Sequence, residues 1–248
     1  MNEIMPVPQA DIVRVASVDP FEMYADEVAP RYIVGKLLRF NKGDYLAGEN
    51  SEPMPGGTRC VAALDELMIG WIKWHGGKPV EHLMVRLADG NRPPKRDALG
   101  DNEEAQWELD ENTGKRRDPW SFANYLPILE AAAGELFTFT TSTSGGLRTI
   151  GDLSRRYAYH RKRHPDVFPL ITLGVSSYEH KDRQIGRVKY PDFAPAGYAP
   201  KTQFYRALEA AGIVPSTTPA LIEEKQEDTT EEPPPVESED DYREEVPW

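Results

Sequence analysis

Short runs of β-branched and aromatic residues, separated by glycine turns, constrain the fold of this chain more than any other feature. Such runs at short spacing are typical of strands in a β-sandwich or barrel. Glycine turns follow the runs at Gly43-Asp44 and at His75-Gly76-Gly77. The pattern predicts strands over residues 31–40, 58–64, 66–74, 79–88, 124–129, 135–141, 167–175 and 184–190.

Helical periodicity enters late in the chain, over residues 147–163. Ser144 is expected to cap the start of this helix, and Pro165 is expected to end it. A second, short helix is predicted over residues 202–211 and ends at Gly212. About seven strands with one inserted helix predict a mainly β (α+β) fold, and we expect an OB-like barrel of about 5–7 strands.

Composition divides the chain into segments. Residues 1–30 contain four prolines and are predicted to be an N-terminal arm, and residues 31–213 form the OB-like domain. Within that domain, residues 92–118 carry many charges of both signs and are predicted to form an extended flap loop. Residues 214–248 are rich in Pro, Thr, Glu and Asp, a composition that predicts a disordered acidic tail.

The negative charge is concentrated at the C-terminal end. Residues 222–248 hold twelve Asp and Glu against Lys225 and Arg243, a net charge of −10, while the whole chain carries −12. The rest of the chain is therefore nearly neutral, and the overall acidity does not exclude nucleic-acid binding by the body.

Cysteine content and hydropathy bear on the compartment. Cys60 is the single cysteine, so no disulfide can form within the chain, which indicates a reducing environment. Residues 1–11 lack the basic start and apolar run of a secretory signal, and no apolar run reaches the ~20 residues of a membrane span. We expect a soluble, cytoplasmic protein without membrane partners.

The chain ends in acidic residues followed by Val-Pro-Trp. This end resembles the C-terminal tip of single-stranded DNA-binding proteins, in which an OB-fold core binds the strand and a disordered acidic linker ends in a hydrophobic residue, a proline and an aromatic. Bacterial members usually end in phenylalanine, and Arg243 interrupts the acidic run here, so both positions depart from the family pattern. The resemblance implies that replication or recombination proteins bind Asp240, Asp241, Glu244, Glu245, Val246, Pro247 and Trp248. The alternative is a solubilising tail with no partner.

A single-strand binder needs cations for phosphates and exposed rings for bases. The tryptophans predicted to stack on bases are Trp74, beside a turn, and Trp107 and Trp120, in or next to the charged flap. Phe137 and Phe139 are predicted to be core. The cations predicted to contact DNA are Lys36, Arg39, Lys95, Arg96, Arg116, Arg117, Arg155, Arg156, Arg161, Lys162 and Arg163. The last five stand out because residues 155–163 contain no acid.

Enzymatic motifs are sparse. The chain has no GxxxxGK[ST] phosphate loop and no GxSxG elbow. His160 and His164 have helical i, i+4 spacing but lack the glutamate of HExxH, so neither a metal nor a cofactor is expected. Asp166, Glu179 and Lys181 match the PD-(D/E)xK pattern of magnesium-dependent nucleases, which we retain as an alternative.

Taken together, the sequence predicts a non-enzymatic single-stranded DNA-binding protein of a phage or mobile-element replication or recombination system. The nuclease is one alternative, and an interaction adaptor without DNA affinity is the other. The sequence leaves the oligomeric state open.

Overall fold

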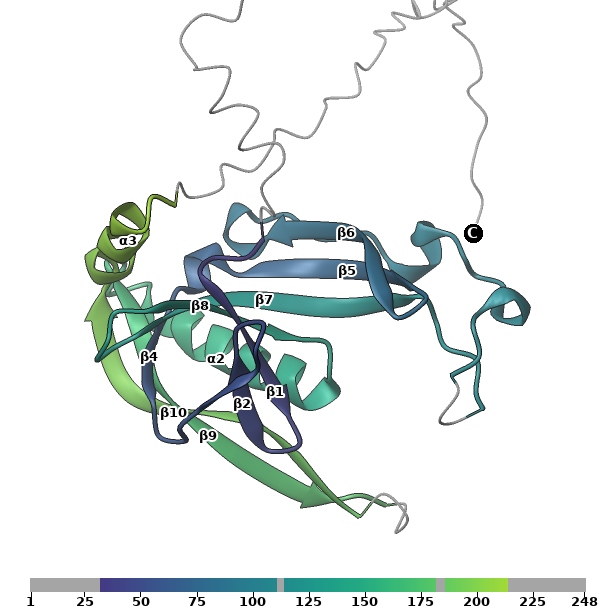
Figure 1. Cartoon of the computed structure of the whole chain (residues 1–248). Helices are drawn as coiled ribbons and strands as arrows, with labels where there is room; N and C mark the ends of the chain where they lie inside the picture. The colour runs from purple at the N-terminus through teal and green to yellow at the C-terminus, as the bar shows by residue number, and fades with distance from the viewer. Residues whose placement is uncertain (1–31, 111–113, 182–185, 214–248) are drawn as a thin grey trace, which may run out of the picture. The chain divides into compact units, whose positions relative to one another are not determined.

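The computed structural model of the chain describes residues 32–110, 114–181 and 186–213 (Figure 1). All of these belong to a first unit, residues 1–217, and residues 218–248 form a second unit. The predicted arm and the predicted tail lie outside the described residues. Within the described ranges, no helix combines the length and the apolar character that crossing a membrane requires.

One sheet dominates the described part of the chain. Its strands are β1 (Lys36–Asn41), β2 (Asp44–Ala47), β3 (Glu52–Met54), β4 (Arg59–Ala62), β5 (Met68–His75), β6 (Lys78–Arg86), β7 (Trp120–Glu130), β8 (Leu136–Thr141), β9 (Val167–Glu179) and β10 (Arg187–Pro200). They follow the order β10-β9-β4-β7-β8-β1-β2-β3, with β5 on β7 and β6 on β5. Strand β1 is parallel to β8, and the other pairs are antiparallel.

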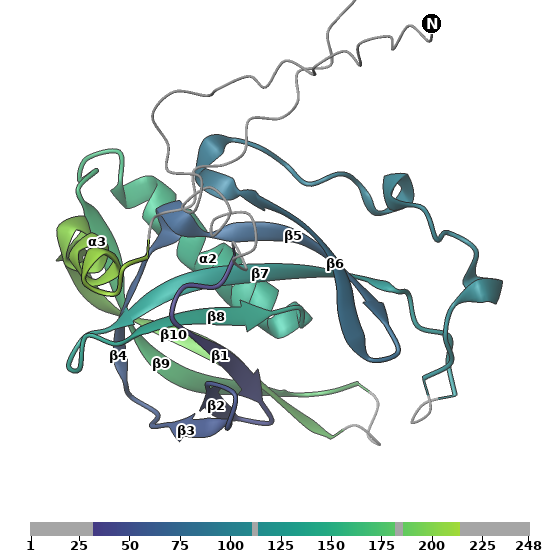
Figure 2. The same ribbon diagram turned by 45° about the horizontal axis from the view of Figure 1, so that its top comes forward.

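Strand β7 organises the sheet. One edge of β7 pairs with β4 at its C-terminal end and with β5 along its first half, and the other edge pairs with β8. Because only the 3₁₀ turn η1 (Leu64–Glu66) separates β4 from β5, the two act as one bent strand. This bend curls the sheet into an open half-barrel (Figure 2).

Aromatic side chains fill the centre of the half-barrel. Phe137 and Phe139 are 3% and 0% exposed, which confirms that they are core residues. Phe139 lies edge to face with Phe193 at 5.2 Å between ring centroids, so it links β8 to β10. The Tyr45 hydroxyl donates a hydrogen bond to the Gly174 carbonyl at 2.7 Å, which ties β2 to β9.

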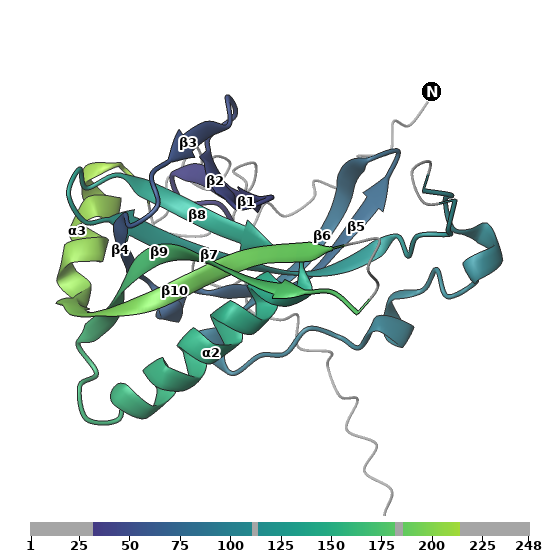
Figure 3. The same cartoon turned by 90° about the horizontal axis from the view of Figure 1, so that it is seen from below.

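Two helices pack against the sheet: α2 (Ser144–His160) beside β10, and α3 (Lys201–Ala210), which follows β10 directly (Figure 3). The predicted cap is displaced by one residue, because the Thr143 hydroxyl, not that of Ser144, accepts a hydrogen bond from the Gly146 amide at 3.2 Å. A Cβ on Gly146 would lie 2.0 Å from Thr141 Oγ1, so only glycine allows the helix to start this close to β8. The buried face of α2 includes Leu153, and its opposite face is open to solvent.

The predicted mainly β fold is confirmed at this level, with more strands than expected. No strand was predicted between residues 41 and 57, where the structure has β2 and β3. The last two strands are longer than predicted, and β10 contains Pro191 and Pro195. Proline is tolerated there because β10 is an edge strand, where one row of amides has no partner strand.

Candidate nucleic-acid interface

The flap, residues 92–118, is folded back along the β5–β6 hairpin (Figure 2). It contains two 3₁₀ turns, η3 (Arg96–Leu99) and η4 (Glu104–Gln106), and a short bridge between Leu109 and Arg116. At its start, Trp71 Nε1 of β5 donates a hydrogen bond to the Pro94 carbonyl at 2.9 Å. The flap is therefore attached to the sheet and is not a free loop.

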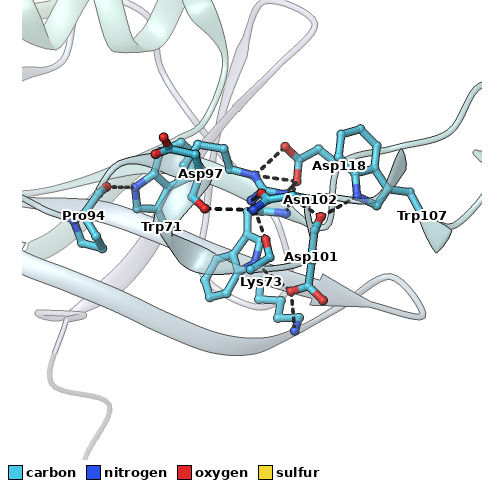
Figure 4. Close-up of polar contacts among 11 residues, drawn as sticks. Trp71, Lys73, Pro94, Asp97, Asp101, Asn102, Trp107 and Asp118 are labelled. Atoms are coloured by element: carbon cyan, nitrogen blue, oxygen red, sulfur yellow. Dashed lines mark hydrogen bonds and ion pairs between the residues drawn. The ribbon is translucent and has the colours of Figure 1, made fainter. Parts of the chain in front are cut away.

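Arg96 links several parts of the flap to one another, including Asn102 and Asp118, which are labelled in Figure 4. Its Nε and one terminal nitrogen donate to the Asp118 carboxylate at 2.7 Å. Its terminal nitrogens also donate to the carbonyls of Gly100 and Asp101 and to the Asn102 side chain, at 2.7, 3.0 and 3.0 Å. All of its donors are used in this way, so Arg96 has none left for a phosphate.

Asp101 fastens the flap to the strands beneath it (Figure 4). Its carboxylate lies 2.7 Å from Lys73 Nζ and accepts a hydrogen bond from Trp120 Nε1 at 3.0 Å. Its backbone carbonyl accepts one from Trp107 Nε1 at 2.7 Å. The hydrogen bond from Lys73, and then that from Trp120, lower the pKa of Asp101 from its ordinary value of 3.8, so the contact is present at neutral pH and is lost in acid below that value.

The Asp101→Asn variant is expected to loosen the flap. Asparagine tolerates the left-handed backbone at this position (φ 51°) as well as aspartate does, so the substitution removes the charge without adding strain. A partly exposed, charge-assisted contact of this kind is worth about 1 kcal/mol, so we expect trypsin to cut the flap roughly five times faster. The control is Asp97→Asn, on exposed η3 of the same flap, which should cut at the wild-type rate. Equal rates for the wild type and both variants would show that Asp101 does not restrain the flap.

The tryptophans predicted as stacking platforms are mostly engaged in this attachment. Trp120 is 5% exposed, so the prediction that it is an open platform is wrong. Trp107 is half-buried, and the Arg96 guanidinium lies 6.0 Å from the centre of its ring. Trp74 is half-buried as well and packs against the small apolar cluster around Ile72. The cause is tertiary: the flap folds back onto β5 and the start of β7 through contacts between residues 19 to 23 positions apart, which no local pattern specifies.

The flap also carries too much negative charge to be a strong phosphate site. Residues 92–118 contain eight Asp and Glu against six Lys and Arg. A pocket of about 330 Å³ beneath the flap, the flap pocket, is lined by Asp101, Glu103, Glu108 and Asp118 and by only two permanent cations, Lys73 and Arg117. Of the other predicted cations, Arg116 donates to the Trp107 carbonyl at 2.8 Å, and Lys95 is exposed.

The two cations predicted on the first strand have partners nearby. Lys36 forms an ion pair with Glu135. The hydrogen bond to Glu135 raises the pKa of Lys36. Arg39 donates a hydrogen bond to the Ser51 hydroxyl at 3.1 Å. Both side chains are exposed, so they could add to a larger basic surface, but they do not make one by themselves.

The solvent-facing side of α2 and the turn that follows it form a strongly basic surface. Residues 144–164 contain six Arg and Lys and a single acid, Asp152. Arg155 pairs with Asp152 at 2.8 Å, and Arg161 lies 3.8 Å from Asp65. No ion pair or side-chain hydrogen bond within the described ranges engages the exposed side chains of Arg156, Lys162 and Arg163.

Tyr159 lies in the middle of this basic surface and is 72% exposed. Positions three and four residues away are its neighbours on a helix. All four of these positions are cations: Arg155 and Arg156 lie on α2, and Lys162 and Arg163 lie in the turn that follows the end of α2 at His160. This surface, Tyr159 with its four cations, is called the α2 patch below. Tyr159 was not among the predicted stacking residues, although its spacing of three and four residues from cations is visible in the sequence.

A second group of rings borders the α2 patch. His160 stacks on Tyr198 of β10 with ring centroids 3.6 Å apart, and on His164 at 4.6 Å. Packing that removes solvent, and then repulsion from His164, lower the pKa of His160, which favours the uncharged ring in this stack. Tyr198 remains 46% exposed, so the end of α2 presents several ring surfaces beside cations.

The proposed nuclease residues are not brought together. Asp166 precedes β9 and Glu179 ends it, so a 13-residue strand separates them by roughly 40 Å at ~3.3 Å per residue. Glu179 instead pairs with Arg187 at 2.9 Å. Two carboxylates that far apart cannot hold one magnesium ion, so these residues do not form the magnesium site of the nuclease alternative. The described ranges also contain no group of three or more His, Cys, Asp or Glu arranged to hold a metal.

The residues predicted to bind partners, 240–248, lie outside the described ranges. Comparisons of the chain with protein-family models, with curated proteins and with solved structures find no match.

Proposed function

We propose that this protein binds single-stranded DNA, through the α2 patch, in replication or recombination. The observation that carries the proposal is the α2 patch itself, an exposed ring with two cations on α2 and two in the turn that follows it. Cations neutralise phosphates and release counterions, and an exposed ring stacks on an unpaired base. Bases in a duplex already stack on each other, so the exposed ring favours a single strand.

The strand order supports an OB-like reading of the half-barrel. With β4 and β5 counted as one bent strand, and with β6 and the flap counted as the connection to β7, the core follows the chain order β4/β5, β7, β8, β9, β10, with α2 between the third and the fourth strand. This is the order expected of an OB-fold. The β1–β2–β3 segment is then an addition, attached to the third strand, β8, by parallel pairing.

In an OB-fold, oligonucleotides bind across strands 2 and 3 and the loops after strands 1 and 4. The flap takes the position of the first of these loops, but it carries more acid than base. We therefore assign the phosphate contacts to α2, which lies outside that usual face, and not to the flap.

Titration of a fluorescent dT oligonucleotide at two salt concentrations tests the proposal. We expect binding that weakens as salt rises, and weaker binding of a duplex of equal length. No binding at low salt would refute DNA binding and leave the adaptor as the alternative. Equal or tighter binding of the duplex would refute the preference for single strands.

The proposed role of the tail rests on its sequence alone. We propose that Val246-Pro247-Trp248 and the acids before it bind a replication or recombination protein, with the ring in an apolar pocket and the acids against a basic rim. Deleting Trp248 should abolish recovery of that partner while oligonucleotide binding is unchanged. Unchanged partner recovery would contradict this role.

Removing residues 222–248 is expected to strengthen oligonucleotide binding. The deleted segment carries a net charge of −10, and such a segment competes with DNA for the protein's cations. Affinity measured at 50 mM salt should rise, and the gain should shrink at high salt because the competition is screened. Weaker binding by the truncated chain would count against a competing tail.

A further inference from the structure

A second pocket lies between α2, the turns η1 and η2 (Leu87–Asp89), and Arg92 at the start of the flap. Its volume is about 420 Å³, within the range of small-ligand pockets. Three of its lining residues are arginines: Arg92 at the start of the flap, and Arg155 and Arg161 of α2 and its C-terminal cap. None of its lining residues is a carboxylate. We call it the arginine pocket.

Charge distinguishes the two pockets. The flap pocket is lined by four carboxylates, whereas the arginine pocket is lined by three cations and no acid. Two acids border the lining: Asp152 pairs with Arg155 at 2.8 Å, and Asp65 accepts a hydrogen bond from the Tyr157 hydroxyl at 2.9 Å and pairs with Lys201. Arg161, 3.8 Å from Asp65, is therefore a secondary partner whose charge remains available. An anion is favoured in the arginine pocket and disfavoured in the flap pocket.

Apart from Ser154, the rest of the lining is largely apolar. Leu64, Leu87, Ala88 and Ala158 contribute to it, together with the ring of Tyr157. Three guanidinium groups at the edge of an apolar surface match a ligand with a phosphate at one end and a flat, weakly polar group at the other. A nucleotide has this chemistry.

Gly151 gives an independent indication. Glycine inside a helix is destabilising relative to alanine. No neighbour requires glycine here, because a Cβ at position 151 would meet nothing within 4 Å. The space in front of Gly151 is part of the arginine pocket, so a larger side chain at this position would occupy volume that a ligand could use.

We propose that the arginine pocket binds one nucleotide, with its phosphate on Arg92, Arg155 and Arg161 and its base on the apolar lining. The proposal rests on the proposed function where the nucleotide belongs to a DNA strand, and it stands independently for a free nucleotide. Arg155 borders both surfaces, so a strand lying on the α2 patch could place one of its units in the pocket.

Calorimetry of the full-length chain with dTMP, thymidine and inorganic phosphate tests the pocket. We expect dTMP to bind, thymidine to bind at least tenfold more weakly, and phosphate alone to bind weakly.

Arg92→Gln, which leaves α2 intact, and Gly151→Leu, which fills the pocket, should each weaken dTMP binding roughly tenfold. Gly151→Ala is the control, because it should raise the Tm by about 2–4 °C and retain most dTMP binding. Wild-type dTMP affinity in both Arg92→Gln and Gly151→Leu would overturn the proposal, as would equal binding of thymidine.

Oligonucleotides then identify the source of the nucleotide. If Gly151→Leu weakens binding of dT₉ both with and without a 5′-phosphate, the pocket binds an internal nucleotide of the strand. If it weakens binding of the 5′-phosphorylated form only, the pocket binds the 5′ end of the strand. If it weakens dTMP alone, the ligand is a free nucleotide. If Gly151→Leu weakens dTMP binding and the protein binds no oligonucleotide, the pocket is supported and the DNA-binding function is refuted. If the protein binds oligonucleotides but neither Arg92→Gln nor Gly151→Leu alters dTMP affinity, the DNA-binding function is supported and the pocket is refuted.

Discussion

Replacing Arg156 and Arg163 together with glutamine is expected to weaken binding of a dT oligonucleotide roughly 25-fold at 0.1 M salt. Each phosphate neutralised on a single strand contributes about 0.7 to the slope of log K against log salt. Losing two contacts should therefore flatten that slope by about 1.4, which corresponds to the 25-fold loss at 0.1 M. Within the described residues, neither side chain takes part in an ion pair, so the fold should not depend on them.

The matched control removes the same charge elsewhere. Lys78 of β6 and Arg206 of α3 are exposed and lie outside the α2 patch. Their double glutamine variant should bind within about threefold of wild type, because long-range effects of net charge are screened at 0.1 M salt. If the two double variants lose equal affinity, binding depends on total charge, and the α2 patch is not the DNA-binding site.

Tyr159→Ala is expected to weaken oligonucleotide binding by roughly 5- to 150-fold, because a base stacked on a ring is worth about 1–3 kcal/mol. The change should leave the salt slope unaltered, since it removes no cation. Tyr159→Phe keeps the ring and should bind like the wild type. Thermal unfolding should be nearly unchanged for both variants, because Tyr159 is 72% exposed. Fluorescence titration with dT oligonucleotides measures each of these effects.

A second exposed tyrosine provides the comparison. Tyr178, on β9, is 50% exposed and is not surrounded by the cations of α2. Its alanine variant should keep wild-type affinity. If Tyr178→Ala weakens binding while Tyr159→Ala does not, the interface lies on the β9–β10 hairpin, the other loop position at which an OB-fold binds strands.

The helix that carries the proposed site was predictable because the information for it is local. Helical periodicity, a stop at Pro165 and the run of cations all lie within about twenty residues of one another. Neighbours on a helix face follow from spacing alone, so Tyr159 and its cations could have been placed together without a structure. The predicted cap was one residue away from the observed one, because Ser144 and Thr143 are both suitable cap residues. The structure uses Thr143, whose hydroxyl accepts the hydrogen bond from Gly146, where the chain passes close to Thr141.

By itself, the sequence determined the mainly β character of the body, the position of α2 and its basic face, and the separation of charge between body and tail. The tertiary structure decided which side chains are available. It buried Trp120 under the flap, used every donor of Arg96, and placed Asp166 and Glu179 at opposite ends of one strand. It also brought Arg92 beside Arg155 and Arg161. Local patterns fix the conformation and charge of a segment, whereas exposure and proximity depend on contacts between residues far apart in the chain, and no local pattern specifies those contacts.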